Sequence, residues 1–170
     1  MLILMAGLPG RGKSTLARQL APALDAAILS KDIVRHALFE PGLVEYSTAQ
    51  DDFVIDLLLL TAEYVWERHP TKAIILDGRT FSRAAQRQHV IDFADVHRQP
   101  CRIIECICDD DIARSRLAQP DPDHPAGNRT PQLYDEVKRR WEPITQPKIV
   151  IDTSNAIDLA SVIAQLKRES

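Results

Sequence analysis

The stretch from Gly7 to Ser14 constrains the fold of this chain more than any other. It reads Gly-Leu-Pro-Gly-Arg-Gly-Lys-Ser and matches the spacing G-x-x-x-x-G-K-S. Glycines at this spacing let backbone N–H groups wrap around an anion, the lysine ammonium adds positive charge, and the serine hydroxyl can bind Mg²⁺. The stretch therefore predicts a phosphate-binding loop (P-loop, or Walker A motif) for Mg·ATP.

The residues on both sides supply the setting that a P-loop needs. Leu2–Ala6 is an apolar run typical of a short buried strand, and helical character follows from Ser14 to about Pro22. A strand, a glycine loop and a helix in this order direct the positive end of the helix toward bound phosphates. We expect the nucleotide to contact Gly7, Leu8, Pro9, Gly10, Arg11, Gly12, Lys13, Ser14 and Thr15.

The remainder of the chain alternates between strand and helix patterns. Apolar runs that predict strands lie at 26–30, 73–77, 102–108 and 148–153, and helical patterns lie at 31–38, 48–68, 83–97, 112–119, 131–141 and 157–167. Such alternation predicts a doubly wound α/β fold, with a mainly parallel five-stranded sheet flanked by helices. No repeat or linker divides the pattern, so we expect residues 1–170 to form one domain.

Two aspartates follow predicted strands on the side where open α/β sheets bind their ligands. Asp77 closes the apolar run 73–77 like the acid of a Walker B strand, and we expect it to bind Mg²⁺ together with Ser14. Asp32 follows the strand at 26–30, and Arg35 shares its side of the next helix. The residues alone leave Asp32 open between a helix cap and a catalytic carboxylate.

A proline-rich run at 120–129 interrupts the regular pattern. Arg114 and Arg116 precede it on a short helix, and a second helix follows it. Two helices joined by such a run predict a lid over the nucleotide at about 112–140, with an ordinary surface loop as the alternative. The acidic run 109–111 is expected to charge the start of its helix, and a metal site there is the less favoured interpretation.

Two further expectations concern helices. The pattern at 48–68 is apolar on most sides, so we expect this helix to be largely buried. Its acids Asp51, Asp52 and Asp56 are then expected to lie in the first turns of the helix and to face solvent. Ser82 is expected to cap the helix that follows it.

Composition excludes several classes of protein. The chain has 170 residues, of which 45% are hydrophobic and 26% charged, and its net charge is −3. A protein that binds nucleic acid over much of its surface is usually basic, so this net charge does not indicate that function. Its apolar runs are too short for a signal peptide or a membrane span. Cys101, Cys106 and Cys108 lack a metal-binding spacing, which indicates free buried thiols in a reducing, cytoplasmic setting. The five histidines show no metal-ligand spacing, and no G-x-S-x-G elbow is present.

Together these motifs resemble the small P-loop kinases that include adenylylsulfate kinase, polynucleotide 5′-kinase, chloramphenicol phosphotransferase and zeta-toxin-type kinases. The resemblance rests on the P-loop, on the segments 32–36, 75–80 and 147–153, and on the arginines of the predicted lid. It implies a P-loop NTPase fold and transfer of the γ-phosphate of Mg·ATP to a hydroxyl group. It also implies that Asp32 receives or orients the acceptor hydroxyl, that Arg35 contacts the acceptor, and that Lys13, Arg114 and Arg116 act on the phosphates.

The segment 32–36 and the ending Pro-x-x-Val-Ile-Asp-Thr are most similar to adenylylsulfate kinase, although the glycine- and lysine-rich lid of that enzyme is absent. We expect a small hydroxyl compound as acceptor, with nucleotide-like compounds among the candidates. Few aromatic residues and a net negative charge disfavour a polynucleotide 5′-hydroxyl, the first alternative. A basic patch could still form from Arg79, Arg83, Arg87, Arg114 and Arg116. The second alternative is a non-enzymatic nucleotide-dependent switch or a plain ATPase.

Overall fold

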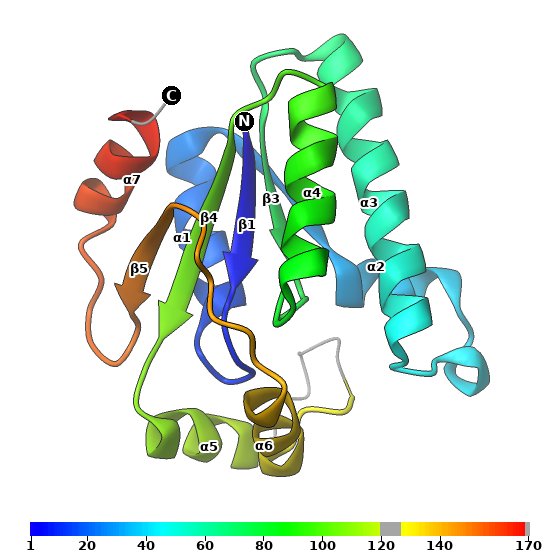
Figure 1. The fold of residues 1–170 in the computed structure, drawn as a ribbon, viewed down its shortest axis with the longest axis vertical. Coiled ribbons are helices and arrows are strands. Elements are labelled where there is room, and N and C mark those ends of the chain that lie inside the picture. Colours follow the sequence, from blue (N-terminus) through cyan, green and yellow to red (C-terminus); the bar gives the residue numbers. More distant parts are fainter. Residues whose placement is uncertain (120–126, 169–170) are drawn as a thin grey trace.

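The central strand of the fold is β1 (Leu2–Ala6), the strand that leads into the P-loop (Figure 1). The computed structural model describes residues 1–119 and 127–168. β1 lies third in a fully parallel sheet of order β2-β3-β1-β4-β5. The other strands are β2 (Ala26–Ser30), β3 (Ala73–Asp77), β4 (Cys101–Ile107) and β5 (Lys148–Asp152). The prediction of a five-stranded parallel sheet is confirmed.

Helices cover both faces of the sheet. They are α1 (Lys13–Leu24), α2 (Lys31–Leu38), α3 (Thr48–Arg68), α4 (Ala84–Val96), α5 (Asp110–Ala118), α6 (Pro131–Arg139) and α7 (Leu159–Arg168), with a 3₁₀ turn at Pro41–Leu43. Leu2 and Leu4 pack toward α3 and α4, whereas Ile3 and Met5 pack toward α1 and α7. Because both faces of β1 are covered, every residue of this strand is buried, which explains its unbroken apolar run.

The order of the strands places the P-loop at the point where the chain changes direction across the sheet. The chain runs from β1 to one side through β2 and β3, and then to the other side through β4 and β5. The carboxyl ends of all five strands face α5 and α6 (Figure 1). A third cluster of apolar residues joins these two helices to the P-loop: Leu8, Cys108, Ala113, Leu117, Tyr134 and Val137. A switch point of this kind is where open α/β sheets bind ligands.

The structure corrects two of the expectations for individual helices. α1 continues through Pro22 to Leu24, so this proline lies in the last turn of the helix and does not end it. Arg83, and not Ser82, occupies the N-cap position of α4, and its backbone N–H donates to the side chain of Gln86. Ser82 is buried, and its carbonyl oxygen accepts a hydrogen bond from the backbone N–H of Glu142.

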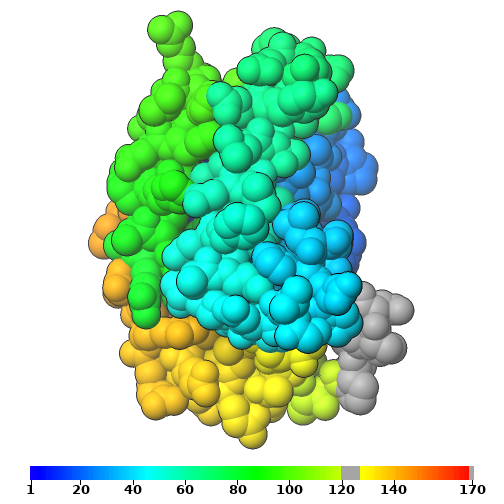
Figure 2. Space-filling model, turned by 90° about the vertical axis from the view of Figure 1, so that its right-hand side faces the viewer, coloured from blue at the N-terminus to red at the C-terminus, as the bar shows by residue number. Residues whose placement is uncertain are grey.

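The expectation that α3 is largely buried is wrong for one of its faces. Residues of one stripe, including Ile55, Leu58 and Trp66, pack into the core. Phe53, Leu60 and Tyr64 belong to the opposite stripe and are each more than half exposed. Figure 2 shows α3, in cyan and teal, crossing the face of the molecule with α4 on one side. The sheet can cover only one face of a helix that crosses it, so the apolar pattern alone overestimated burial.

Two further findings bear on the expectations from composition. Cys101, Cys106 and Cys108 are free thiols, and Cys106 and Cys108 are buried. Burial raises the pKa of Cys106 to about 12, so this thiol is inert at neutral pH. None of the helices within 1–119 and 127–168 combines the length and the apolarity that a bilayer crossing requires.

Candidate active site

The P-loop is shaped by glycines with positive φ angles. Gly7, Gly10 and Gly12 have φ angles of 137°, 75° and 72°. A Cβ atom on Gly7 would lie 2.5 Å from the carbonyl oxygen of Cys106, and one on Gly10 would lie 2.5 Å from that of Ala113. The loop therefore runs against β4 and α5 at distances that only glycine permits. Gly12 caps α1, and the first turn of α1 contains no acidic side chain, so nothing neutralises its positive end.

Lys13 lies folded back onto its own loop. Its Nζ atom donates to the carbonyl oxygens of Gly7 and Leu8 at 2.8 and 2.9 Å. Withdrawal from water lowers the pKa of Lys13, and the negative charges of Asp77 and Asp32 partly oppose this effect. The ammonium group thus lies between the P-loop and the two acids that follow β3 and β2.

Asp77 and Ser14 have the properties that a Mg²⁺ site in a P-loop protein requires. Asp77 ends β3 and is 4% exposed, and its Oδ1 atom is buried with no hydrogen-bond partner among the described residues. A metal-bound water would satisfy this oxygen. No group of three or more His, Cys, Asp or Glu side chains able to hold a metal occurs in the described parts of the chain. A sparse protein ligand set suits Mg²⁺, which usually keeps several waters and binds substrate phosphates.

One cavity of about 640 Å³ joins the P-loop to the residues that follow β2 and β3. Its nucleotide end is lined by Pro9, Gly10, Gly12, Lys13, Ser14, Thr15, Arg116, Thr153 and residues 155–157. Its opposite end is lined by Lys31, Asp32, Arg35, Tyr46, Asp51, Gly78 and Arg79, and Thr80 lies beside the P-loop, where its carbonyl oxygen accepts from the backbone N–H of Gly7. Of the site residues predicted from sequence, the structure thus brings together Pro9, Gly10, Gly12, Lys13, Ser14, Thr15, Asp32, Arg35 and Arg116. The predicted residues Gly7, Leu8, Arg11 and Asp77 are not among those that line the cavity.

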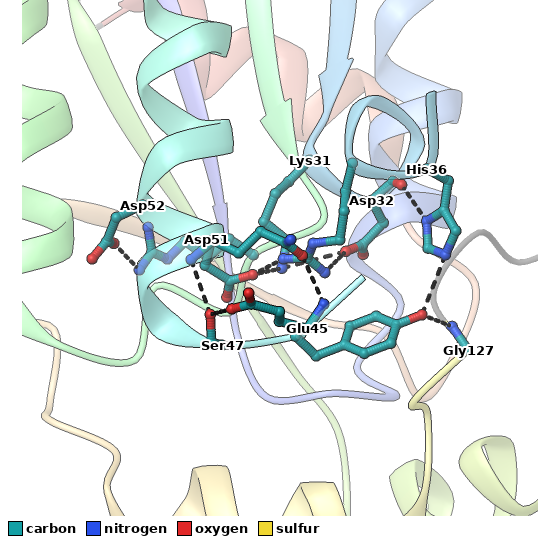
Figure 3. Close-up of polar contacts among 12 residues, drawn as sticks. Lys31, Asp32, His36, Glu45, Ser47, Asp51, Asp52 and Gly127 are labelled. Atoms are coloured by element: carbon teal, nitrogen blue, oxygen red, sulfur yellow. Dashed lines mark hydrogen bonds and ion pairs between the residues drawn. The ribbon is translucent and has the colours of Figure 1, made fainter. Parts of the chain in front are cut away.

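Asp32 lies in a group of charged side chains, several of which line the cavity (Figure 3). Asp32 Oδ1 is 3.3 Å from both Lys31 Nζ and Arg35 Nη1. All three side chains are buried. Burial lowers the pKa of Lys31 to about 8, with Asp32 opposing and Arg35 reinforcing the effect. The structure therefore holds Asp32 as the counter-ion of two cations inside the cavity.

The first two turns of α3 supply two more acids to this group (Figure 3). Asp51 Oδ1 accepts from Lys31 Nζ at 2.8 Å and also from Arg35 Nη2, and Asp52 accepts from Arg79. The expectation of solvated acids is therefore wrong for Asp51, whose side chain is 23% exposed, whereas Asp52 is exposed as expected and also paired. No signal in the sequence could have found these pairs, because they join segments 16 to 27 residues apart. Lys31 was also missed, although its place beside Asp32 at the end of a strand was a usable signal.

The two arginines of the predicted lid lie in different places. Arg116 donates to the carbonyl oxygen of Gly10 at 3.3 Å and to Thr153, at 3.1 Å for Oγ1 and 2.7 Å for the carbonyl oxygen. It therefore ties α5 to the P-loop at the cavity wall. Arg114 pairs with Asp135 of α6 at 2.6 Å and does not line the cavity. A contact of Arg114 with nucleotide remains a prediction.

The remaining arginines do not gather into one basic patch. Arg87 is fully buried and donates to the carbonyl oxygens of Phe81 and Pro143, so its role is structural. Arg11 donates to the hydroxyl of Tyr134, next to Asp110. Asp110 also accepts from Lys138 and Tyr134, and these hydrogen bonds lower its pKa to about 2. Asp110, in the first turn of α5, thus links the P-loop residue Arg11 to α6. The acidic run 109–111 lies at the start of α5, as expected.

The predicted lid is described in part. α5, α6 and residues 127–130 lie at the mouth of the cavity, and Asn128, Arg129, Leu133 and Val137 line it. Residues 120–126 of the predicted lid lie outside the described residues. The backbone N–H of Gly127 donates to the hydroxyl of Tyr46 at 2.8 Å, which connects this side of the cavity to the end that holds Asp32 (Figure 3).

The sheet order and the P-loop after β1 define a P-loop NTPase fold of the kinase type. The chain belongs to the family described as an AAA domain, which matches residues 2–141. A search of the curated proteins finds no match. Among solved structures, a proposed kinase from Chloroflexus aurantiacus J-10-fl is 24% identical, with a TM-score of 0.75 over 99% of this chain and 97% of that chain.

Two other solved structures carry ligands. The APS kinase CysC of Mycobacterium tuberculosis, solved with AMPPNP and APS, is 18% identical, with a TM-score of 0.71 over 98% of this chain and 96% of that chain. Kti12 of Chaetomium thermophilum, solved with ADP-AlF3, is 16% identical, with a TM-score of 0.69 over 99% of this chain and 98% of that chain. At these identities the likeness shows the shared fold.

Proposed function

We propose that this chain is an ATP-dependent kinase that transfers the γ-phosphate of Mg·ATP to a hydroxyl group of a small molecule. The observation that carries the proposal is one cavity with a P-loop at one end and Asp32 at the other. A nucleotide-dependent switch has no need of a buried carboxylate facing the phosphates. The neighbours solved with AMPPNP and with ADP-AlF3 support nucleotide binding at such a loop.

The nucleotide end would bind Mg·ATP through the P-loop. The backbone amides of residues 7–15 would cradle the β- and γ-phosphates, and Lys13 would leave the carbonyl oxygens of Gly7 and Leu8 to reach them. Ser14 and the orphaned oxygen of Asp77 would hold Mg²⁺, directly or through water. When bound, the metal neutralises charge on the phosphates. Arg116 lies against Gly10, where it can stabilise the transferred group.

Asp32 would serve the acceptor. The hydroxyl oxygen of the acceptor attacks the γ-phosphorus, a new O–P bond forms, and the bond to the β,γ-bridging oxygen breaks to release ADP. The hydroxyl proton passes to Asp32. Arg35 holds Asp32 Oδ1 at 3.3 Å and thereby keeps the carboxylate facing the cavity. We place the lid at about 112–140 of a single kinase domain, with Arg114 as a second nucleotide contact once the lid closes.

An acceptor screen tests the proposal. Purified protein with Mg·ATP is assayed for ADP release, first without acceptor and then with gluconate, glucitol, adenosine, adenylylsulfate, chloramphenicol and a 5′-hydroxyl oligonucleotide. A kinase releases ADP slowly until its acceptor arrives, because base and lid align only then. Rapid release without any acceptor supports a plain ATPase instead, and phosphorylation of the oligonucleotide alone supports a polynucleotide kinase. Lys13→Ala is the control that reports contaminating activity.

A further inference from the structure

Three cations line the end of the cavity that holds Asp32, and all three are buried. Lys31, Arg35 and Arg79 are 6%, 1% and 4% exposed. Lys31 and Arg35 come from α2, which directly follows β2, and Arg79 comes from the turn after β3, the strand next to β2 in the sheet. A buried cation requires a partner, since an unpaired charge away from water is strongly unfavourable. Asp32 alone cannot balance three positive charges.

The missing negative charges come from a different element. Asp51 lies in the first turn of α3 and Asp52 directly follows it, and their side chains are 23% and 55% exposed. They reach the cations from the rim of the cavity, whereas Asp32 is 8% exposed. A single oxygen, Asp51 Oδ1, serves both Lys31 and Arg35. This is the place where the oxygens of a bound oxyanion would sit.

The guanidinium groups of Arg35 and Arg79 each have an N–H donor that is not used in the hydrogen bonds described above. Arg35 Nε and Arg79 Nε are buried with no hydrogen-bond partner within the described residues. A guanidinium binds a carboxylate, phosphate or sulfate through two parallel N–H groups, of which Nε is commonly one. The ring of Tyr46 lies 5.1 Å from the guanidinium carbon of Arg35 and holds that side chain in place. These donors fit an anionic ligand better than a neutral polyol.

We propose that Lys31, Arg35 and Arg79 form an anion subsite, and that the acceptor carries an oxyanion group that displaces Asp51 and Asp52 from these cations. The statement about the acceptor rests on the proposed kinase function. The anion subsite itself does not depend on that function. The oxyanion binds at the three cations, which leaves the acceptor hydroxyl next to Asp32 and directed toward the P-loop. Asp51 and Asp52 are the counter-ions that this oxyanion replaces.

Sulfate is the probe, because it is a small oxyanion without a hydroxyl to be phosphorylated. It is titrated by calorimetry into protein saturated with Mg·AMPPNP, which fills the P-loop, and in parallel into Lys13→Ala without nucleotide. One binding site is expected in both samples. Lys31→Met should weaken this binding about tenfold or more, since one buried positive charge is lost. Absence of sulfate binding in both samples overturns the proposal.

The aspartates of α3 provide the sharpest test, because they should act as competitors of the ligand. Asp51→Asn is expected to tighten sulfate binding about fivefold or more, since a like charge leaves the subsite. Asp52→Asn, at the more exposed position, should act in the same direction and serves if Asp51→Asn folds poorly. Asp56→Asn is the matched control, because Asp56 pairs with His89 away from the cavity. Unchanged or weaker binding in both variants shows that these acids belong permanently to the site.

The pH dependence of sulfate binding reports on Lys31. Burial holds the pKa of Lys31 at about 8, and Asp32, Asp51, Arg35 and Arg79 face this side chain. Only its protonated form attracts an anion, so sulfate affinity should fall as pH rises through about 8. Lys31→Arg should bind sulfate with a flat profile from about pH 7 to 9.5, because a guanidinium stays charged. A flat profile in the unmodified protein removes Lys31 from the subsite.

Matched acceptors separate the two proposals. In the ADP-release assay, gluconate is compared with glucitol, and adenosine 3′-phosphate with adenosine. The charged member of a productive pair should have a KM at least about tenfold lower. If sulfate binds but phosphate is transferred to none of these compounds, the result supports the anion subsite and argues against the proposed kinase function. Transfer to a neutral compound with equal efficiency supports the kinase and overturns the anionic acceptor.

Discussion

At the scale of single residues, Arg35 and Arg87 show that partners decide what a buried arginine does. Arg35 is 1% exposed and pairs with Asp32 and Asp51 inside the cavity. Arg87 is fully buried and donates to two backbone carbonyl oxygens, those of Phe81 and Pro143. The sequence predicted that Arg35 contacts the acceptor, and it left Arg87 as a member of a basic patch that could form. Only Arg35 has carboxylate partners that a ligand can replace.

Asp32 and Asp77 should lose different functions when their charge is removed. Asp32→Asn is expected to keep ATP affinity within a few-fold and to lower the transfer rate by roughly 10²–10⁴, the range for a lost general base. Asp77→Asn should instead raise the Mg²⁺ concentration needed for half-maximal rate, since the buried, unpartnered oxygen of Asp77 is a proposed Mg²⁺ ligand that would lose its negative charge. Both are measured as kcat, KM for ATP and Mg²⁺ dependence, with thermal unfolding to check folding. Transfer at the normal rate by Asp32→Asn returns Asp32 to the role of a helix residue.

At the scale of elements, the P-loop is held between β4, α5 and the end of β5. Gly7 approaches Cys106 at the end of β4, and Gly10 approaches Ala113 of α5. Arg116 of α5 bonds both Gly10 and Thr153, which follows β5. The position of α5, and with it the described part of the predicted lid, is therefore coupled to the conformation of the loop.

Gly10→Ala should disrupt this contact. Its Cβ would lie 2.5 Å from the carbonyl oxygen of Ala113 and 3.0 Å from Leu117 Cγ, at a φ angle of 75° that favours glycine. We expect a loss of about 1–3 kcal/mol in the free energy of unfolding and weaker binding of Mg·AMPPNP. Gly42→Ala is the control, because no atom lies within 4 Å of its added Cβ. Equal stability of the two variants in urea unfolding would contradict the close packing of loop and helix.

At the scale of the whole molecule, bound nucleotide should stabilise the fold through several elements at once. The cavity is lined by residues from the P-loop, α1, α2, α5, α6 and the segment after β5. A ligand at about 100 times its Kd stabilises the native state by about 2.7 kcal/mol. For a chain of this size that corresponds to a rise in Tm of roughly 5–11 °C.

Thermal unfolding with and without Mg·AMPPNP measures this rise. Removal of Mg²⁺ with EDTA should abolish most of it, because the metal neutralises the phosphates. Lys13→Ala should abolish it as well, whereas Lys72→Ala should retain it, since Lys72 pairs with Asp25 on the surface. A full shift in Lys13→Ala would place the nucleotide elsewhere.

The sequence by itself determined the fold class, the strands and the position of the P-loop. These depend on local patterns: apolar runs that are buried on both faces, glycines at fixed spacing, and a helix directly after them. Asp32 and Asp77 were found for the same reason, since each directly follows or closes a predicted strand. Patterns of this kind are set by neighbouring residues, so a single sequence reveals them.

Only the tertiary structure decided which charges meet. Asp51 and Asp52 read as solvated acids of a helix start, yet they reach Lys31, Arg35 and Arg79 across the cavity. The structure also decided that one apolar stripe of α3 stays exposed and that Arg114 pairs with Asp135 outside the cavity. The physical reason is that ion pairs and burial depend on distances between segments far apart in the chain. Those distances are set by the packing of α3 and α5 against the sheet and the P-loop, which no local pattern encodes.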